Sequence, residues 1–172
     1  SNFKMKNYLH TFKIFNDLIN EEIALFMNNV KIKNYTKNDI IINEGEEGDS
    51  LLFVIDGKIV ITQALTLVTN KLDEGDDREK QLTKLNSNDH KIMFGELALF
   101  SPDKKRNASV KAVEDCKIAG ITFDEIFKIC NENNAVGYKL MKNLSEIISK
   151  NLISSNNKVL KLTTAFSLLI DQ

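Results

Sequence analysis

Short runs of β-branched and aromatic residues dominate the middle of the chain and constrain its fold more than any other feature. Asn, Asp and Gly turn residues separate these runs. The runs are Val30–Lys33, Ile40–Ile42, Leu51–Ile55, Lys58–Ile61, Ala108–Val113 and Cys116–Ile121. Short strands at such close spacing predict a β-barrel or jelly roll.

Helical patterns flank the strand region on both sides. Residues 12–27 place apolar side chains at helical spacing, which predicts one amphipathic helix, with a shorter helix before it over residues 3–11. After the last strand, Thr122 and Glu125 have the spacing of a capping box and predict another helix start. We therefore expect an α+β fold in three parts: an N-terminal helical segment over residues 1–28, a β-jelly-roll core over 29–121, and C-terminal helices over 122–172.

The composition is that of one globular domain without a charge excess. The 172 residues are 42% hydrophobic and carry a formal net charge of −1, which suits a single core and offers no basic surface for DNA. No apolar run is long enough to cross a bilayer, and the first residues lack the apolar centre of a signal peptide. We therefore expect a cytoplasmic protein, with Cys116 and Cys130 as reduced structural thiols.

The sequence contains no pattern typical of a metal-binding site. An acidic cluster lies at residues 73–79, in a connection that we expect to form an exposed hairpin tip, but its spacing departs from that of an EF-hand loop. A metal enzyme on a jelly roll would need several histidines with a carboxylate, and His10 and His90 are the only histidines. We expect no metal, no cofactor and no enzymatic activity.

Residues 94–110 combine a glycine, a carboxylate, a short apolar turn and an arginine. Gly95 would let backbone N–H groups approach an anion, and a helical turn from Glu96 would aim unpaired N–H groups at a phosphate. Arg106 would supply the full charge, because its planar guanidinium can bind two phosphate oxygens at once. Only Arg78 and Arg106 are arginines among 23 basic residues. These features suit a sugar phosphate.

Two blocks of this sequence resemble those of a known family. Phe94–Leu99 followed by Arg106–Val110 resembles the phosphate-binding cassette of cyclic nucleotide-binding domains, and Asp39–Ile59 is similar to the family's first conserved strand block. The resemblance implies that Arg106 neutralises the cyclic phosphate and that Glu96 holds the ribose 2′-hydroxyl. The ligand-binding residues that it implies in the cassette are Gly95, Glu96, Leu97, Ala98, Arg106 and Asn107.

Turn residues in the strand region carry a second set of expectations. Gly45 and Gly48 stand where we expect turns with positive φ. Asn38 and Asn88 stand where the family usually has glycine, and asparagine tolerates the left-handed region better than most residues. The turns are therefore expected to be retained.

The final helix is predicted to run from about Ala135 to Ile170. An apolar seam with alternating spacings of four and three residues follows it for four heptads; its members are Met141, Ser145, Ile148, Leu152, Ser155, Val159, Leu162, Phe166 and Leu169. So long a helix would extend beyond its own domain, so we expect a homodimer, the alternative being a helix that packs only on its own barrel. Similarity to the catabolite activator branch of the family implies that Ser155 and Asn156 meet the nucleotide base.

The leading interpretation is a non-enzymatic cyclic nucleotide sensor that favours cAMP over cGMP. It would come from a transcription regulator of the catabolite activator type without its DNA-binding part, or act as a stand-alone sensor. A regulatory domain of a cAMP- or cGMP-dependent kinase is the alternative. A third reading is a dimeric interaction module that has lost its ligand, suggested by Asn107, because relatives usually carry Ala, Ser or Thr there. Glu96 and Arg106, both present, argue against that loss.

Overall fold

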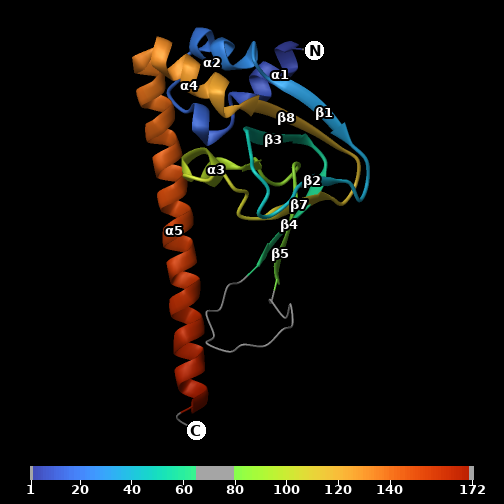
Figure 1. Ribbon diagram of the computed structural model, residues 1–172, viewed down its shortest axis with the longest axis vertical. Coiled ribbons are helices and arrows are strands. Elements are labelled where there is room, and N and C mark those ends of the chain that lie inside the picture. Colours follow the sequence, from blue (N-terminus) through green and yellow to red (C-terminus); the bar gives the residue numbers. More distant parts are fainter. Residues whose placement is uncertain (1, 65–79, 171–172) are drawn as a thin grey trace.

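Antiparallel strands form the centre of the protein, and helices gather at one end of it (Figure 1). This computed structural model describes residues 2–64 and 80–170. The strands are β1 Lys31–Tyr35, β2 Ile40–Ile42, β3 Ser50–Asp56, β4 Lys58–Ala64, β5 Lys80–Asn86, β6 Met93–Phe94, β7 Ser109–Ala112 and β8 Cys116–Thr122. They form two four-stranded sheets, in the orders β1-β8-β3-β6 and β2-β7-β4-β5. The predicted α+β fold with a jelly-roll-like core is confirmed.

Strand pairing follows the predicted runs and adds two strands to them. β3 and β8 pair from Ser50 opposite Thr122 to Asp56 opposite Lys117. β4 and β5 form a hairpin whose first and last pairs are Lys58 with Asn86 and Ala64 with Lys80. β5 and β6 were not predicted, and the expected hairpin tip, including the acidic cluster at 73–79, lies outside the described residues.

The helices are α1 Asn2–Leu9, the 3₁₀ turn η1 Lys13–Phe15, α2 Asn20–Met27, α3 Glu96–Phe100, α4 Phe123–Glu132 and α5 Asn134–Ile170. The prediction of a helix start at Thr122 is confirmed, because its hydroxyl accepts a hydrogen bond from the Glu125 N–H at 3.2 Å. The prediction of one helix over residues 12–27 is wrong. Asp17 has φ 65° and interrupts it, and α2 starts afresh after Ile19, whose N–H donates to Glu22 Oε1 at 3.0 Å.

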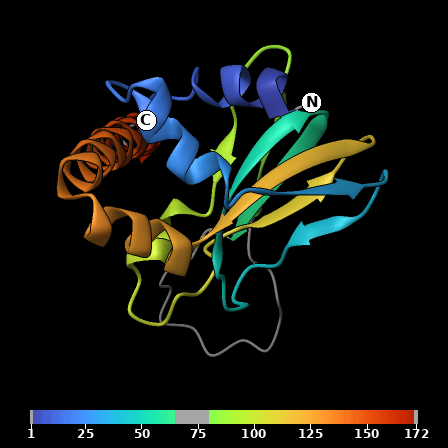
Figure 2. The same ribbon diagram turned by 90° about the horizontal axis from the view of Figure 1, so that it is seen from above.

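Aromatic packing joins the N-terminal segment to the first sheet. Phe12 meets Phe53 of β3 edge-on with ring centroids 5.1 Å apart, and Phe15 stacks on the same ring at 5.8 Å. All three side chains are buried, and Figure 2 shows α1 and α2 beside the strands in the view from above. A second cluster, with Val54, Ile59, Val110 and Ile118 among its members, fills the space between the two sheets.

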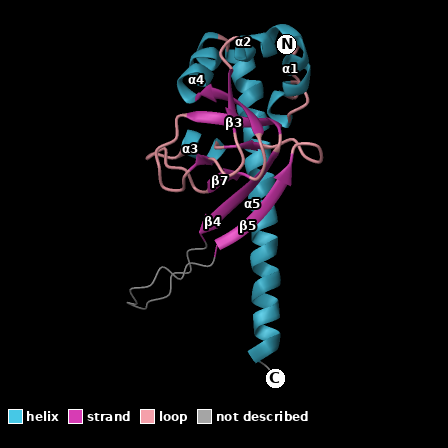
Figure 3. Cartoon of the chain, turned by 90° about the vertical axis from the view of Figure 1, so that its right-hand side faces the viewer, coloured by secondary structure: helices cyan, strands magenta, loops and turns pink. Residues whose placement is uncertain are grey.

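α5 packs along only its first part. Its buried residues are Val136, Gly137, Leu140, Asn143 and Leu144, and every residue from 151 to 170 is exposed. The helix extends well past the sheets (Figure 3). Apolar side chains of the distal part stay in water, Leu162 with 72% and Phe166 with 66% of its surface exposed. The homodimer that the seam predicts stays a prediction.

Candidate functional site

A loop from a distant part of the sequence, residues 45–48, holds the backbone of Arg106. The Arg106 N–H donates to Glu46 O and the Gly45 N–H donates to Arg106 O, each at 2.8 Å. The Gly48 N–H donates to Lys104 O at 2.7 Å, and Glu47 and Lys105 form an isolated β-bridge. Residues 45–48 and 104–106 thus form a short antiparallel ladder that sets the direction of the Arg106 side chain.

The Arg106 side chain is enclosed on several sides. Only 6% of its surface is exposed. Its guanidinium lies against Gly48 and Gly95, because a Cβ built on either glycine would collide with it, and its Cζ lies 5.9 Å from the centroid of the Phe123 ring. Within the part of the chain that the structure describes, Arg106 Nη1 has no hydrogen-bond partner. A buried guanidinium nitrogen in this state is suited to an anionic ligand.

Charge balance around Arg106 leaves it as a cation. Burial lowers the pKa of its guanidinium, while the carboxylates of Asp49 and Glu96 raise it. Because an arginine titrates far above neutral pH, this shift does not discharge it. The site therefore presents a positive charge flanked by two carboxylates.

Gly95 makes the turn that brings Glu96 next to Arg106. The residue has φ 95° between β6 and α3, a conformation that glycine adopts without the steric penalty of a side chain. Glu96 is half-buried, and burial raises the pKa of its carboxyl group, opposed by a hydrogen bond from its own backbone and by the Arg106 charge. A carboxyl group in this position can accept a hydroxyl hydrogen bond.

A cavity of about 450 Å³ opens beside Glu96. Its walls come from residues 11–14, residues 89–91, Met93 and Glu96, and the α5 residues Ile147 and Asn151. Small-molecule sites typically have volumes of about 300 to 1,000 Å³. The cavity thus offers room for a ligand that also touches Glu96.

The structure brings together some predicted site residues and separates others. Gly95, Glu96 and Arg106 lie together, and Asn107 is exposed next to Arg106 in the chain. In α3, Leu97 is 43% exposed and Ala98 is buried. Ser155 and Asn156 lie on the exposed distal part of α5 and do not line the cavity beside Glu96. The ligand contacts of all these residues stay predictions.

Sequence reasoning missed Asn151, which faces this cavity from α5. A signal for it exists: Leu140, Leu144 and Ile147 follow one another at spacings of four and three on the packed face of the helix, and Asn151 is the next member of that row.

Gly48 is the second residue whose role was missed. The positive φ expected at Gly45 is confirmed at 83° and that at Asn38 at 75°. The expectation is wrong for Gly48, which has no positive φ. The turn at Asn88 is retained without a positive φ, and the Asp89 N–H donates to Asn86 O across it at 3.1 Å. Gly48 is needed instead for the space that its missing side chain leaves to Arg106.

Two further observations concern residues 2–64 and 80–170. In these ranges no group of three or more His, Cys, Asp or Glu side chains lies close enough together to hold a metal ion. No helix in the same ranges has the length and apolar character to span a membrane.

The fold and the site together define a small β-roll domain that buries one arginine beside a glycine turn. The sequence profile of the cyclic nucleotide-binding domain matches residues 32–133. The chain belongs to this family. A comparison with curated proteins gives no match.

Solved structures share the fold. The catabolite activator protein of Thermus thermophilus is 19% identical with a TM-score of 0.70, over 88% of this chain and 63% of that one. A cyclic nucleotide-binding domain from Methylobacillus flagellatus is 18% identical with a TM-score of 0.72, over 92% and 82% of the two chains. A protein described as cAMP-bound PfPKA-R is 29% identical with a TM-score of 0.60, over 74% of this chain and 41% of that one. This chain thus spans less than two thirds of the first and third of these proteins.

Proposed function

We propose that this chain is a regulatory domain that binds a cyclic nucleotide and favours cAMP over cGMP. The observation that carries the proposal is the buried guanidinium of Arg106, whose Nη1 has no partner among the described residues. A cyclic phosphate would supply the missing acceptor and neutralise the charge. The cAMP named for the PfPKA-R structure supports the choice of ligand.

The phosphate and the base would lie on opposite sides of Glu96. The Glu96 carboxylate would accept a hydrogen bond from the ribose 2′-hydroxyl, and backbone N–H groups of Leu97, Ala98 and Asn107 would assist at the phosphate. The base would point into the cavity that Ile147 and Asn151 line. The Asn151 amide can both donate and accept, which matches the N6 and N7 edge of adenine.

Ser155 and Asn156 have a smaller part in this arrangement. They lie one helical turn beyond Asn151 on exposed helix, so they would meet a base only if it extended along α5. We propose that Ser155 and Asn156 become ligand contacts in a dimer, where a second α5 helix would bring them closer to the base.

The effect of ligand binding would be transmitted through α5 to a second copy of the chain. The distal seam includes Leu152 and Val159, with 59% and 60% of their surfaces exposed. Burying such a side chain fully stabilises an assembly by roughly 1.5–3 kcal/mol. A parallel homodimer fits these features. We further propose that the protein works in the cytoplasm, without catalytic activity and without DNA binding by this chain. The parent would be a catabolite activator-like regulator or, alternatively, a cyclic nucleotide-dependent kinase.

Calorimetric titration with cAMP and with cGMP tests the proposal. Arg106→Ala should lose ten- to a hundredfold in affinity, because a charge-assisted contact is worth roughly 1.5–3 kcal/mol and tenfold is about 1.4. Lys105→Ala is the matched control, since it removes an adjacent exposed cation and should change affinity little. Equal binding by wild type and Arg106→Ala would contradict the site.

Two other results would redirect the function. Tighter binding of cGMP than of cAMP would reverse the base preference and point to Asn107, which lies exposed beside the phosphate site. A wild-type protein that binds neither nucleotide but dimerises would favour the interaction module that has lost its ligand.

A further inference from the structure

Asn143 is a buried polar side chain outside the proposed ligand contacts. Its surface is 6% exposed, and Arg106 is the other buried polar or charged side chain in the described part of the chain. Asn143 Nδ2 donates to the carbonyl oxygens of Ile14 and Asn16, at 2.8 Å each. Both amide hydrogens are therefore used to hold the end of η1 against α5.

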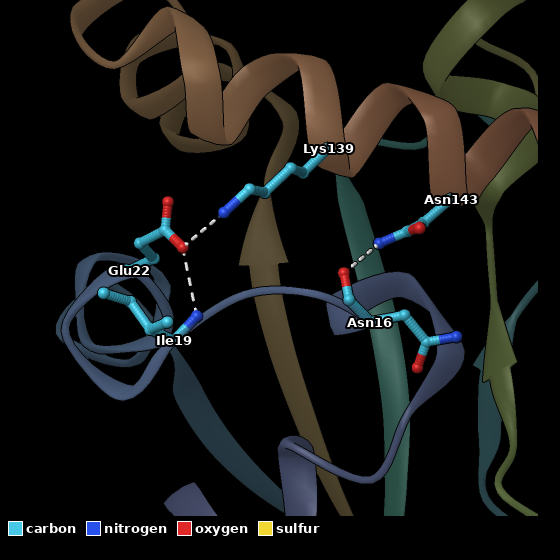
Figure 4. A network of polar contacts seen from close by, with 5 residues as sticks. All are labelled: Asn16, Ile19, Glu22, Lys139 and Asn143. Atoms are coloured by element: carbon cyan, nitrogen blue, oxygen red, sulfur yellow. Dashed lines mark hydrogen bonds and ion pairs between the residues drawn. The ribbon is translucent and has the colours of Figure 1, made fainter.

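A second polar contact ties α5 to the N-terminal segment one turn earlier. Lys139 Nζ lies 2.9 Å from Glu22 Oε1, and the same oxygen accepts the Ile19 N–H at 3.0 Å. Figure 4 shows Lys139 and Asn143 pointing from α5 to this segment. The two contacts connect α5 with the start of α2 and with the end of η1.

The same row of α5 continues into the cavity. Lys139, Asn143, Ile147 and Asn151 follow one another at intervals of four residues, so they lie along one face of the helix. The first two hold the N-terminal segment, and the last two line the cavity beside Glu96. Ile14, whose carbonyl Asn143 holds, lines the same cavity.

We infer that Asn143 is a positioning residue that sets the width of the cavity between η1 and α5, and thereby the size of nucleotide base that the site accepts. The inference rests on the proposed function, because the base is what occupies this cavity. Asn143 does not touch the ligand. It fixes the spacing between the wall that carries Phe12 and Ile14 and the wall that carries Ile147 and Asn151.

The first experiment uses Asn143→Ala in the absence of ligand. The substitution leaves a good helix former in α5 but leaves the buried Ile14 carbonyl without its donor. Amide hydrogen exchange of residues 12–19 should become about tenfold faster, as expected for the loss of two hydrogen bonds. Asn133→Ala is the matched control, because the Asn133 amide donates only to Ile129 O of its own helix, at 3.3 Å. Unchanged exchange in Asn143→Ala would overturn the inference.

The second measurement compares cAMP with cAMP that carries a benzyl group on N6. A positioning role predicts that Asn143→Ala shifts the ratio of the two dissociation constants by at least about threefold in favour of the larger ligand, and that Asn133→Ala does not. Lys139→Met should shift the ratio in the same direction by less, and it remains informative if Asn143→Ala does not fold, because the Lys139 contact is partly exposed.

The outcomes separate the inference from the proposed function. A wild-type protein that binds both ligands, with the same ratio in all the variants, would overturn the positioning role and leave the function intact. A wild-type protein that binds neither ligand would overturn both.

Discussion

Substitution of Gly48 by alanine tests the placement of the Arg106 guanidinium without changing Arg106 itself. Gly48 has no positive φ, so alanine fits its backbone. A Cβ there would lie 2.5 Å from Arg106 Cζ and 2.7 Å from Cδ, whereas carbon atoms in contact prefer about 3.5–4.0 Å. The side chain must therefore move by about 1 Å, and Gly95 and the Phe123 ring limit where it can go.

The expected effect of Gly48→Ala is a loss of about ten- to a hundredfold in cAMP affinity by calorimetry, because a displaced guanidinium forfeits a charge-assisted phosphate contact. Gly45→Ala is the control. Gly45 has φ 83° and no atom within 4 Å of a built Cβ, so alanine there should cost about 1–2 kcal/mol of stability. Because its N–H can still donate to Arg106 O, affinity should fall much less than in Gly48→Ala. Wild-type affinity in Gly48→Ala would refute the idea that Arg106 can take its position only because Gly48 has no side chain.

Four further outcomes are expected. Burial raises the pKa of Glu96, so the folded state holds a proton at pH values where the unfolded state has released it. The free energy of unfolding therefore falls as pH rises from the ordinary carboxyl pKa through the raised one. Ligand-free Glu96→Gln should thus melt at a higher temperature than wild type near pH 7 and at the same temperature near pH 4. The same variant should bind cAMP more weakly while binding 2′-deoxy-cAMP as wild type does. Leu162→Lys places like charges across the seam and should give monomers by analytical ultracentrifugation, and a monomeric wild type would refute the dimer. Asn151→Ala should weaken cAMP binding by about five- to tenfold and Ser155→Ala by less; the reverse order in competition titrations would return the base to Ser155.

Local sequence patterns were enough for most elements of this fold. α5 was placed almost to the residue, since no proline interrupts it and its apolar pattern is continuous. β5 was missed because it is an edge strand whose residues are largely polar, and it is a strand through its pairing with β4. The break between η1 and α2 was not predicted; the segment before it is held by Asn143, which lies 129 residues from Ile14 in sequence, a contact that local patterns do not reveal.

The candidate site likewise contains residues that the sequence predicted and residues that it did not. Gly95, Glu96 and Arg106 were identifiable because they lie close together in the sequence. The part of Gly48 was not, since it depends on a loop pairing between residues 45–48 and 104–106. Asn151 required the rotational phase of α5, which is known only once its buried face is known.

The exposed distal part of α5 connects helix formation with association. Residues 151–170 are all exposed, so this part of the helix lacks the tertiary packing that supplies most helical stability in proteins. Val159, Thr163 and Thr164 are β-branched, which lowers helix propensity further, although each threonine hydroxyl donates to a backbone carbonyl one turn back, at 2.9 Å. In a monomer this segment would exchange between helix and coil, and a partner helix would remove that exchange. The far-ultraviolet circular dichroism of the protein should therefore gain helical signal as its concentration rises.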